Sequence, residues 1–188
     1  GEALGNLAGT INELGHREEA LATRREAVDM LVQTVGDEHH SAVISRSAYS
    51  NELRTAGAFA DAERVGRQAL DAALRAFGPS HSLTAYAQNV AGQAFCAGSD
   101  PEAGAKMLRA SLNTRRAVLP ADNWLIANGE SLLGACLGRL GAAAEAERLL
   151  RSGYDGMRAV RGDAHKKTVE AHDRLVAFEA TRLSSSQN

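Results

Sequence analysis

The sequence predicts an all-α fold, an α-solenoid in which antiparallel helix pairs repeat along the chain. Three observations support this prediction. Marker residues recur about every 42 positions, apolar residues follow the i, i+3, i+4, i+7 spacing of a helix face, and no segment alternates with the period of a strand. Only three of the 188 residues are proline, so few positions would interrupt a helix.

The repeat is clearest in the first half of the chain. Five residue pairs there lie 42 positions apart: Gly15 and Gly57, Ala20 and Ala62, Ala27 and Ala69, Gly36 and Gly78, and His39 and His81. A third copy is predicted from Gly98, Ala103 and Ala110, offset by 41 because its turn has lost one residue. A fourth copy, offset by 43, follows from Gly141, Ala146 and Gly153.

Each copy contains two helices joined by a short turn. In the first copy, an apolar stripe predicts a helix that ends at Gly15, since glycine accepts the left-handed backbone of a helix end at little cost. A second stripe predicts a helix that ends at Gly36. Ala20 lies in the first turn of that second helix, where a larger side chain would hold the two helices apart. The Gly and Ala pattern is therefore a packing element, without a chemical role.

Four units are expected at residues 2–43, 44–84, 85–125 and 126–168. They are followed by a capping helix at 168–183 and a disordered tail at 184–188. Together they predict four and a half helix pairs in a right-handed superhelix. Because the first residue is Gly1 and already lies in a helical pattern, we expect the chain to be a segment of a longer protein.

Composition and charge exclude several classes of function. The net charge is −2 and the pI is about 6.3, and basic residues alternate with acidic ones, so we expect no nucleic-acid partner. No apolar run approaches the roughly 18 residues of a membrane span, so we expect no membrane partner. Cys96 and Cys136 lie in apolar helical stretches without a CxxC spacing. They predict two buried thiols in a reducing compartment and a cytoplasmic location.

The sequence contains no pattern of catalytic or metal-binding chemistry. It lacks a phosphate-binding GxxxxGK[ST] loop, a GxSxG nucleophile turn and an HExxH zinc motif, so we expect no enzyme, cofactor or metal. His39, His81 and His165 occupy one repeat position, and residues a full repeat apart cannot converge on one ion. This spacing favours helix capping.

The helix pair with Gly at its turn, then Ala, then Ala seven residues on, resembles a tetratricopeptide repeat (TPR). The 42-residue period and the connections "VGDEHH", "FGPSHS" and "RGDAHK" more specifically resemble the kinesin-light-chain-like subtype. His40, Ser82 and Lys166 depart from that pattern, which usually has Pro after the His. The stretch from Leu119 to Leu150 also resembles the last repeats of arms that follow the kinase domain in some bacterial serine/threonine kinases.

In a stacked solenoid, the first helix of each unit lines a concave groove. Aligning the turn glycines places a set of polar and aromatic residues there. The resemblance adds an Asn pair that grips a peptide backbone, matched by Asn6 and Asn89. The candidate groove residues are Asn6, Asn12, Glu13, Ser47, Asn51, Arg54, Gln88, Asn89, Phe95, Ser131 and Arg139. Arg54 and Arg139 could pair with an acidic ligand side chain or lie solvated.

Three functional hypotheses follow. The first is a non-catalytic scaffold that binds a peptide or protein segment in the groove. The second is a regulatory or sensor arm of a larger enzyme, such as a bacterial serine/threonine kinase or a signalling ATPase. The third is self-association through exposed terminal helices.

Overall fold

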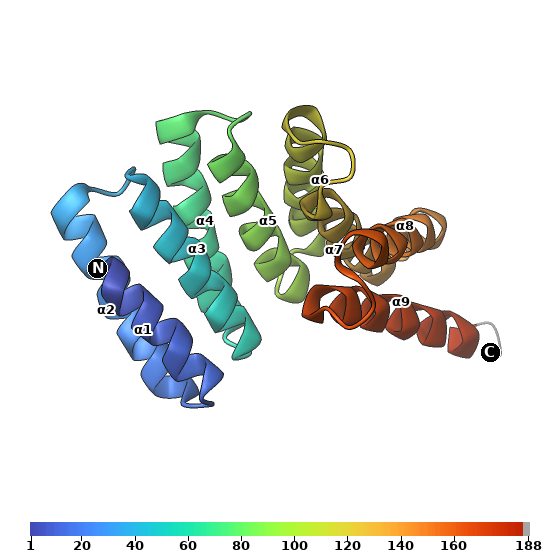
Figure 1. Cartoon of the computed structure of the whole chain (residues 1–188), viewed down its shortest axis with the longest axis horizontal. Helices are drawn as coiled ribbons and strands as arrows, with labels where there is room; N and C mark the ends of the chain where they lie inside the picture. Colours follow the sequence, from blue (N-terminus) through green and yellow to red (C-terminus); the bar gives the residue numbers. More distant parts are fainter. Residues whose placement is uncertain (186–188) are drawn as a thin grey trace.

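The computed structural model describes residues 1–185, which form nine helices and no strand. The helices are α1 (Glu2–Glu13), α2 (Arg17–Val35), α3 (His40–Thr55), α4 (Phe59–Phe77), α5 (Ser82–Ala97), α6 (Pro101–Val118), α7 (Trp124–Arg139), α8 (Ala143–Arg161) and α9 (Lys166–Ser185). Each odd-numbered helix up to α7 pairs with the helix that follows it. The pairs succeed one another along the molecule, so the two termini lie at opposite ends (Figure 1).

The helix starts keep one period throughout the described chain. The helices α3, α5, α7 and α9 begin at residues 40, 82, 124 and 166, and α2, α4, α6 and α8 begin at 17, 59, 101 and 143. Every step is 42 residues, so the predicted offsets of 41 and 43 around the third copy are wrong. At the two positions that carry the marker alanines in the other copies, the third copy has the buried residues Gly104 and Ser111, each one position beyond the predicted Ala103 and Ala110.

A proline explains why the third copy looked shortened. Gly36, Gly78 and Gly162 end the other long helices with positive φ angles of 91°, 76° and 78°. The residue at this position in the third copy is Pro120, whose ring fixes φ near −65°. The helix α6 therefore ends one residue early, at Val118, and the connection to α7 is one residue longer. No residue is lost.

The predicted histidine caps are confirmed. His39, His81 and His165 each accept a hydrogen bond at Nδ1 from a backbone N–H two residues on, at 3.3, 3.1 and 3.1 Å. In the third connection the Oδ1 atom of Asn123 replaces the imidazole and accepts from the Leu125 N–H at 3.0 Å. Each cap satisfies one of the free N–H groups at the start of a helix.

The last helix is longer than predicted. We expected a capping helix at 168–183 and a disordered tail at 184–188. The helix α9 begins at Lys166 and continues to Ser185, so the first two residues of that tail are helical. The remaining residues of the expected tail, 186–188, lie outside the described part of the chain. The helix α9 packs against α7 and α8, as the first helix of a further unit would.

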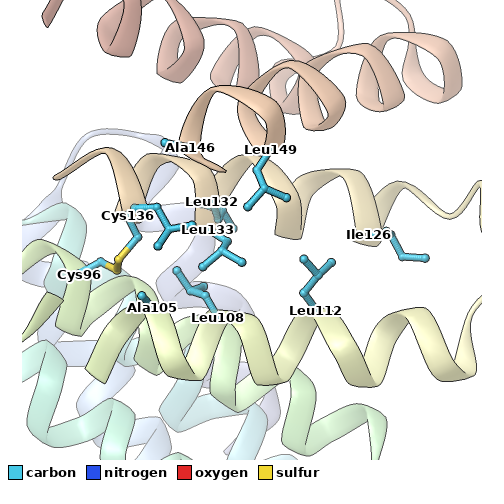
Figure 2. Close-up of a cluster of buried hydrophobic side chains, with 11 residues drawn as sticks. Cys96, Ala105, Leu108, Leu112, Ile126, Leu132, Leu133, Cys136, Ala146 and Leu149 are labelled. Carbon is cyan, nitrogen blue, oxygen red and sulfur yellow. A yellow bond between two sulfur atoms is a disulfide. The ribbon is translucent and has the colours of Figure 1, made fainter. Parts of the chain in front are cut away.

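The largest apolar core cluster lies where α5, α6, α7 and α8 meet, and a disulfide is part of it (Figure 2). Leu108, Leu112 and Leu133 are its largest fully buried side chains. Cys96 on α5 and Cys136 on α7 are joined by the disulfide, with a Cα–Cα distance of 5.7 Å. The prediction of two free thiols is therefore wrong. The expectation of a reducing compartment was based on those thiols, so it loses this support. The residues are 40 positions apart, so no short-range motif indicated the bridge.

Candidate functional site

A polar groove runs along the first helices of successive units. It contains a cavity of about 680 Å³ to which α3, α5, α7 and α9 all contribute side chains. Asn51 and Arg54 come from α3, and Asn89 comes from α5. Trp124 and Asn128 at the start of α7 and Arg174 on α9 complete it. These positions repeat because the helices keep the 42-residue register. Tyr86, Asn128 and Glu170, for example, are equivalent residues of α5, α7 and α9.

Four of the predicted groove residues line this cavity: Asn12, Asn51, Arg54 and Asn89. Two others line neighbouring pockets. Asn6 lies beside Arg24 in a pocket formed by α1, α2 and α3. Arg139 lies with Arg54 in a smaller pocket beside the disulfide.

The remaining predicted residues are not on the cavity wall. Ser47 and Ser131 are fully buried, and Ser131 accepts a hydrogen bond from Arg174 Nη1 at 3.1 Å. Phe95 is only 4% exposed, and its ring lies under the Arg67 guanidinium of α4 at 4.7 Å. Gln88 is half-buried and Glu13 is exposed. Gln88 and Phe95 were chosen with the one-residue error in the third copy. The true equivalent of Asn51 in that copy is Gln93, which does line the cavity.

The sequence analysis missed five important lining residues: Tyr86, Gln93, Arg115, Asn128 and Arg174. An unbroken 42-residue register would have found Gln93 from Asn51. It gives no reason to select Tyr86 or Asn128, because the equivalent residue of α3 is Ile44. Arg115 lies on α6, a second helix, whereas the groove candidates were taken from the first helix of each unit. Arg174 lies on α9, which was treated as a cap and not as a groove helix.

Burial governs the charges of the groove. Burial lowers the pKa of the Arg54 guanidinium, while the negative charge of Glu170 on α9 acts in the opposite direction. Burial also lowers the pKa of Arg174, which Glu170 likewise opposes. For Glu170 itself, burial would raise the pKa, but the Lys167 hydrogen bond and the charges of Lys167, Arg174 and Lys166 bring it below its ordinary value. All three groups remain charged near neutral pH.

Several polar atoms on the groove wall are buried without a hydrogen-bond partner among the described residues. They are the donors Arg54 Nε and Asn89 Nδ2 and the acceptor Asn128 Oδ1. A buried polar group without a partner costs free energy, so such atoms are uncommon in folded proteins. The other polar atom of the Asn89 amide has a partner, because its Oδ1 accepts from Gln93 Nε2 at 2.9 Å. Residues of the wall therefore carry both donors and an acceptor whose hydrogen-bonding capacity is unused among the described residues.

The described residues contain no cluster of three or more His, Cys, Asp or Glu side chains that could hold a metal ion. None of their helices combines the length and the apolar character that crossing a membrane requires. The site is a polar groove on a helical scaffold.

This architecture defines an α-solenoid of helix–turn–helix repeats, a class whose concave surface serves as a scaffold. Comparison identifies the repeat, since residues 46–83 match the tetratricopeptide repeat family model. The described chain as a whole has the fold of tetratricopeptide and kinesin-light-chain-like repeat proteins. Tetratricopeptide repeats mediate protein–protein interaction, and their fold is a non-catalytic scaffold.

Solved structures illustrate the likeness. A Podosopora anserina protein described as a kinesin light chain of nearly identical TPR-like repeats is 15% identical, with a TM-score of 0.78; the match covers 99% of this chain and 88% of that one. A second structure with the same description gives a TM-score of 0.77 at the same identity. BtubC (BKLC) of P. vanneervenii is 17% identical, with a TM-score of 0.72, over 85% of this chain and 63% of that one. No curated protein matches the chain in sequence.

Proposed function

We propose that the chain binds an extended segment of a partner protein in the groove between α3, α5, α7 and α9. One observation carries this proposal: residues that line one cavity carry buried donors and a buried acceptor without hydrogen-bond partners among the described residues. A peptide backbone presents N–H donors and C=O acceptors in alternation, and so complements both kinds of group. An apolar ligand would leave all of these atoms without a partner.

The scale of the cavity supports the same ligand. A volume of about 680 Å³ is that of a small-molecule pocket, but here it is open along one side and extends over four helices. Smaller pockets continue the depression past Arg139 and, near the N-terminal end, past Asn6. An extended segment that lies across successive units would occupy them together.

The test is binding of an array of random dodecapeptides to the whole chain, followed by fluorescence anisotropy on the best peptide. The double variant Asn89→Ala with Asn128→Ala removes two of the amides that contact the ligand. We expect it to lose about tenfold or more in affinity, because each lost hydrogen bond to a buried partner costs roughly 0.5–1.5 kcal/mol. Asn113→Ala, at an exposed position of α6, is the matched control and should bind like the wild type.

Two results would reject the proposal. If no peptide binds the wild-type chain, the peptide-binding role itself is wrong. If peptides bind and the double variant binds them equally well, the groove is not the binding surface. The variant Asn51→Ala with Arg54→Ala probes the α3 side of the groove in the same assay.

Exposed apolar side chains at the N-terminal end favour a second candidate function, self-association. Leu7 and Leu14 of α1 are 50% and 71% exposed, while the second-unit residue equivalent to Leu7 is the half-buried Tyr49. Such side chains would be covered if two copies met through α1. Sedimentation at several protein concentrations tests this function. Leu7→Glu with Leu14→Glu should then shift any dimer to the monomer, and a monomer at every concentration would rule it out.

A further inference from the structure

A buried arginine stands where every other unit has a buried apolar side chain. The residues equivalent to Arg115 are Leu31, Ala73 and Met157, and all three belong to the apolar core. Arg115 is itself only 6% exposed. It lies on the second helix of its unit, α6, yet it reaches the groove cavity. Packing alone does not account for a guanidinium at this position.

The surroundings of Arg115 supply almost none of its hydrogen bonds. Its Nη1 donates to the Leu125 carbonyl oxygen at 3.1 Å, and no described carboxylate forms an ion pair with it. The guanidinium lies against the backbone of α7, since a Cβ placed on Gly129 would be in ordinary van der Waals contact with Nη1, at 3.6 Å. The neighbouring Arg116 is, in contrast, paired with Glu130 at 2.6 Å on the exposed side of the helix.

This arrangement is costly for the free protein. An arginine stays protonated in proteins and carries five N–H donors. A buried charge without a counter-ion destabilises the fold, so such a group usually has a partner in the functional state. Burial lowers the pKa of Arg115, while the nearby Tyr86 acts in the opposite direction. Burial also raises the pKa of Tyr86, so this phenol stays protonated and is a second donor on the cavity wall.

We infer that Arg115, with Tyr86 beside it, binds the carboxylate of an acidic side chain carried by the segment in the groove. This inference rests on the proposed function. A guanidinium pairs best with a planar carboxylate, to which it can donate two parallel hydrogen bonds. The cavity wall carries the acids Glu52, Glu170 and Asp173 but five basic residues, so its net positive charge suits an acidic segment. A free anion would also leave the Asn128 acceptor unpartnered, whereas the backbone of an acidic peptide supplies its donor.

The experiment compares two random dodecapeptide libraries that differ only at a fixed central position, one with Glu and one with Gln. The best Glu peptide and its Gln counterpart are then titrated by fluorescence anisotropy. We expect the wild-type chain to prefer Glu by about 10- to 100-fold, the range of a hydrogen-bonded charge pair. Arg115→Met should abolish the preference while the Gln peptide, which loses at most a hydrogen bond to a neutral amide, still binds. Arg115→Lys should keep only part of it.

Met is the residue that the fourth unit carries at this position, so Arg115→Met is expected to fold. Retained binding of the Gln peptide shows in the same assay that the groove is intact. Arg148→Met, which removes an exposed arginine of α8, is the matched control and should keep the full preference for Glu.

The possible failures are distinguishable. If the chain binds no peptide, the proposed function fails. If it binds Glu and Gln peptides equally, or if Arg115→Met keeps the preference, the function stands and the carboxylate site is rejected. A third arm replaces the central Glu by phosphoserine. A tighter, Arg115-dependent affinity for that peptide would overturn the assignment to a carboxylate.

Discussion

The second unit (α3 and α4) and the third unit (α5 and α6) bring their helices together in different ways. In the second unit, Ser50 is fully buried and its Oγ donates to the Ala62 carbonyl oxygen at 2.7 Å. In the third unit the same two positions are Gly92 and Gly104. A Cβ on Gly104 would lie 2.6 Å from the Cys96 backbone nitrogen and 2.7 Å from the Gly92 oxygen. One crossing is held by a hydrogen bond, and the other by direct contact between backbones.

The turns inside the two units differ as well. In the second unit, Gly57 has a φ of +82° and the helix α4 starts without a side-chain cap. In the third unit, Gly98 has a φ of −101°. There the Asp100 side chain accepts from the Ala103 N–H at 2.9 Å, and Pro101 occupies the first turn of α6. A turn with a left-handed glycine and a turn that leads into a side-chain-capped helix with proline in its first turn therefore both fit the same 42-residue period.

The two units differ most in how the first helix of each packs against the first helix of the next unit. The helices α3 and α5 pack along much of their length, while α5 and α7 share only a short contact. The disulfide joins α5 to α7 near their C-terminal ends, and the groove cavity lies beside the preceding turns of both helices. The covalent bond thus supports a junction with little packing between its first helices. This comparison leads to four predictions, in order of decreasing effect.

Loss of the disulfide should have the largest effect. The bridge closes a loop of about 40 residues, and cross-links of this size stabilise a fold by about 3–4 kcal/mol. We expect Cys96→Ala with Cys136→Ala to lower the free energy of unfolding by that amount, as measured by urea denaturation. The wild type should fall to the same value when dithiothreitol is added.

The double variant provides its own control, because dithiothreitol should not change its stability. Equal stability of the oxidised and reduced wild type would show that the bridge adds nothing to the junction. We also expect the peptide affinity of the groove to fall on reduction, since the bridge fixes the spacing of two of its four helices.

Gly104→Ala should have the next largest effect. The added methyl group meets two backbone atoms, which cannot move aside as a flexible side chain can. We expect a loss of about 2–3 kcal/mol by urea denaturation, despite the better helix propensity of alanine. Gly9→Ala is the matched control, because its nearest neighbour would be a side-chain atom of Arg24 at 3.7 Å. It should be neutral or stabilising, and a similar loss in both variants would contradict the close crossing.

The third unit also shows how far the sequence predicted the molecule. The 42-residue period and the helix pairs were predictable, because burial of one helix face leaves a regular apolar pattern. The third unit was displaced by one residue because glycine and proline replaced the marker Ala and Gly at positions 104 and 120. Of all the predictions, those of the groove residues were affected most by this one-residue displacement. Arg115 and the disulfide were not predictable, because each depends on contacts that local periodicity does not encode.

Arg115→Met should raise the stability of the fold, in contrast to the loss of the disulfide and to Gly104→Ala. Substitution replaces an unpaired buried charge with the apolar residue of the fourth unit. We expect the free energy of unfolding to rise by about 1–2 kcal/mol in the absence of peptide. Ala73→Arg, the reverse change in the second unit, should be strongly destabilising, because Ala73 is fully buried in the apolar core. A less stable Arg115→Met would mean that the arginine is a packing residue.

The smallest predicted effect concerns the caps, in which the second and third units agree. His81→Ala removes the acceptor for the Leu83 N–H and the ring that stacks on Phe77 at 4.9 Å. We expect a loss of about 1 kcal/mol, the usual value of an N-cap, in thermal or urea unfolding.

His81→Asn separates the two contributions. The fourth unit already uses an amide at this position, where Asn123 caps α7. Asparagine at 81 should therefore restore the hydrogen bond without the ring, so the difference between His81→Asn and the wild type measures the contact with Phe77. If Asn and Ala destabilise the fold equally, the imidazole contributes through its ring alone, and the cap would carry none of the free energy that joins one unit to the next.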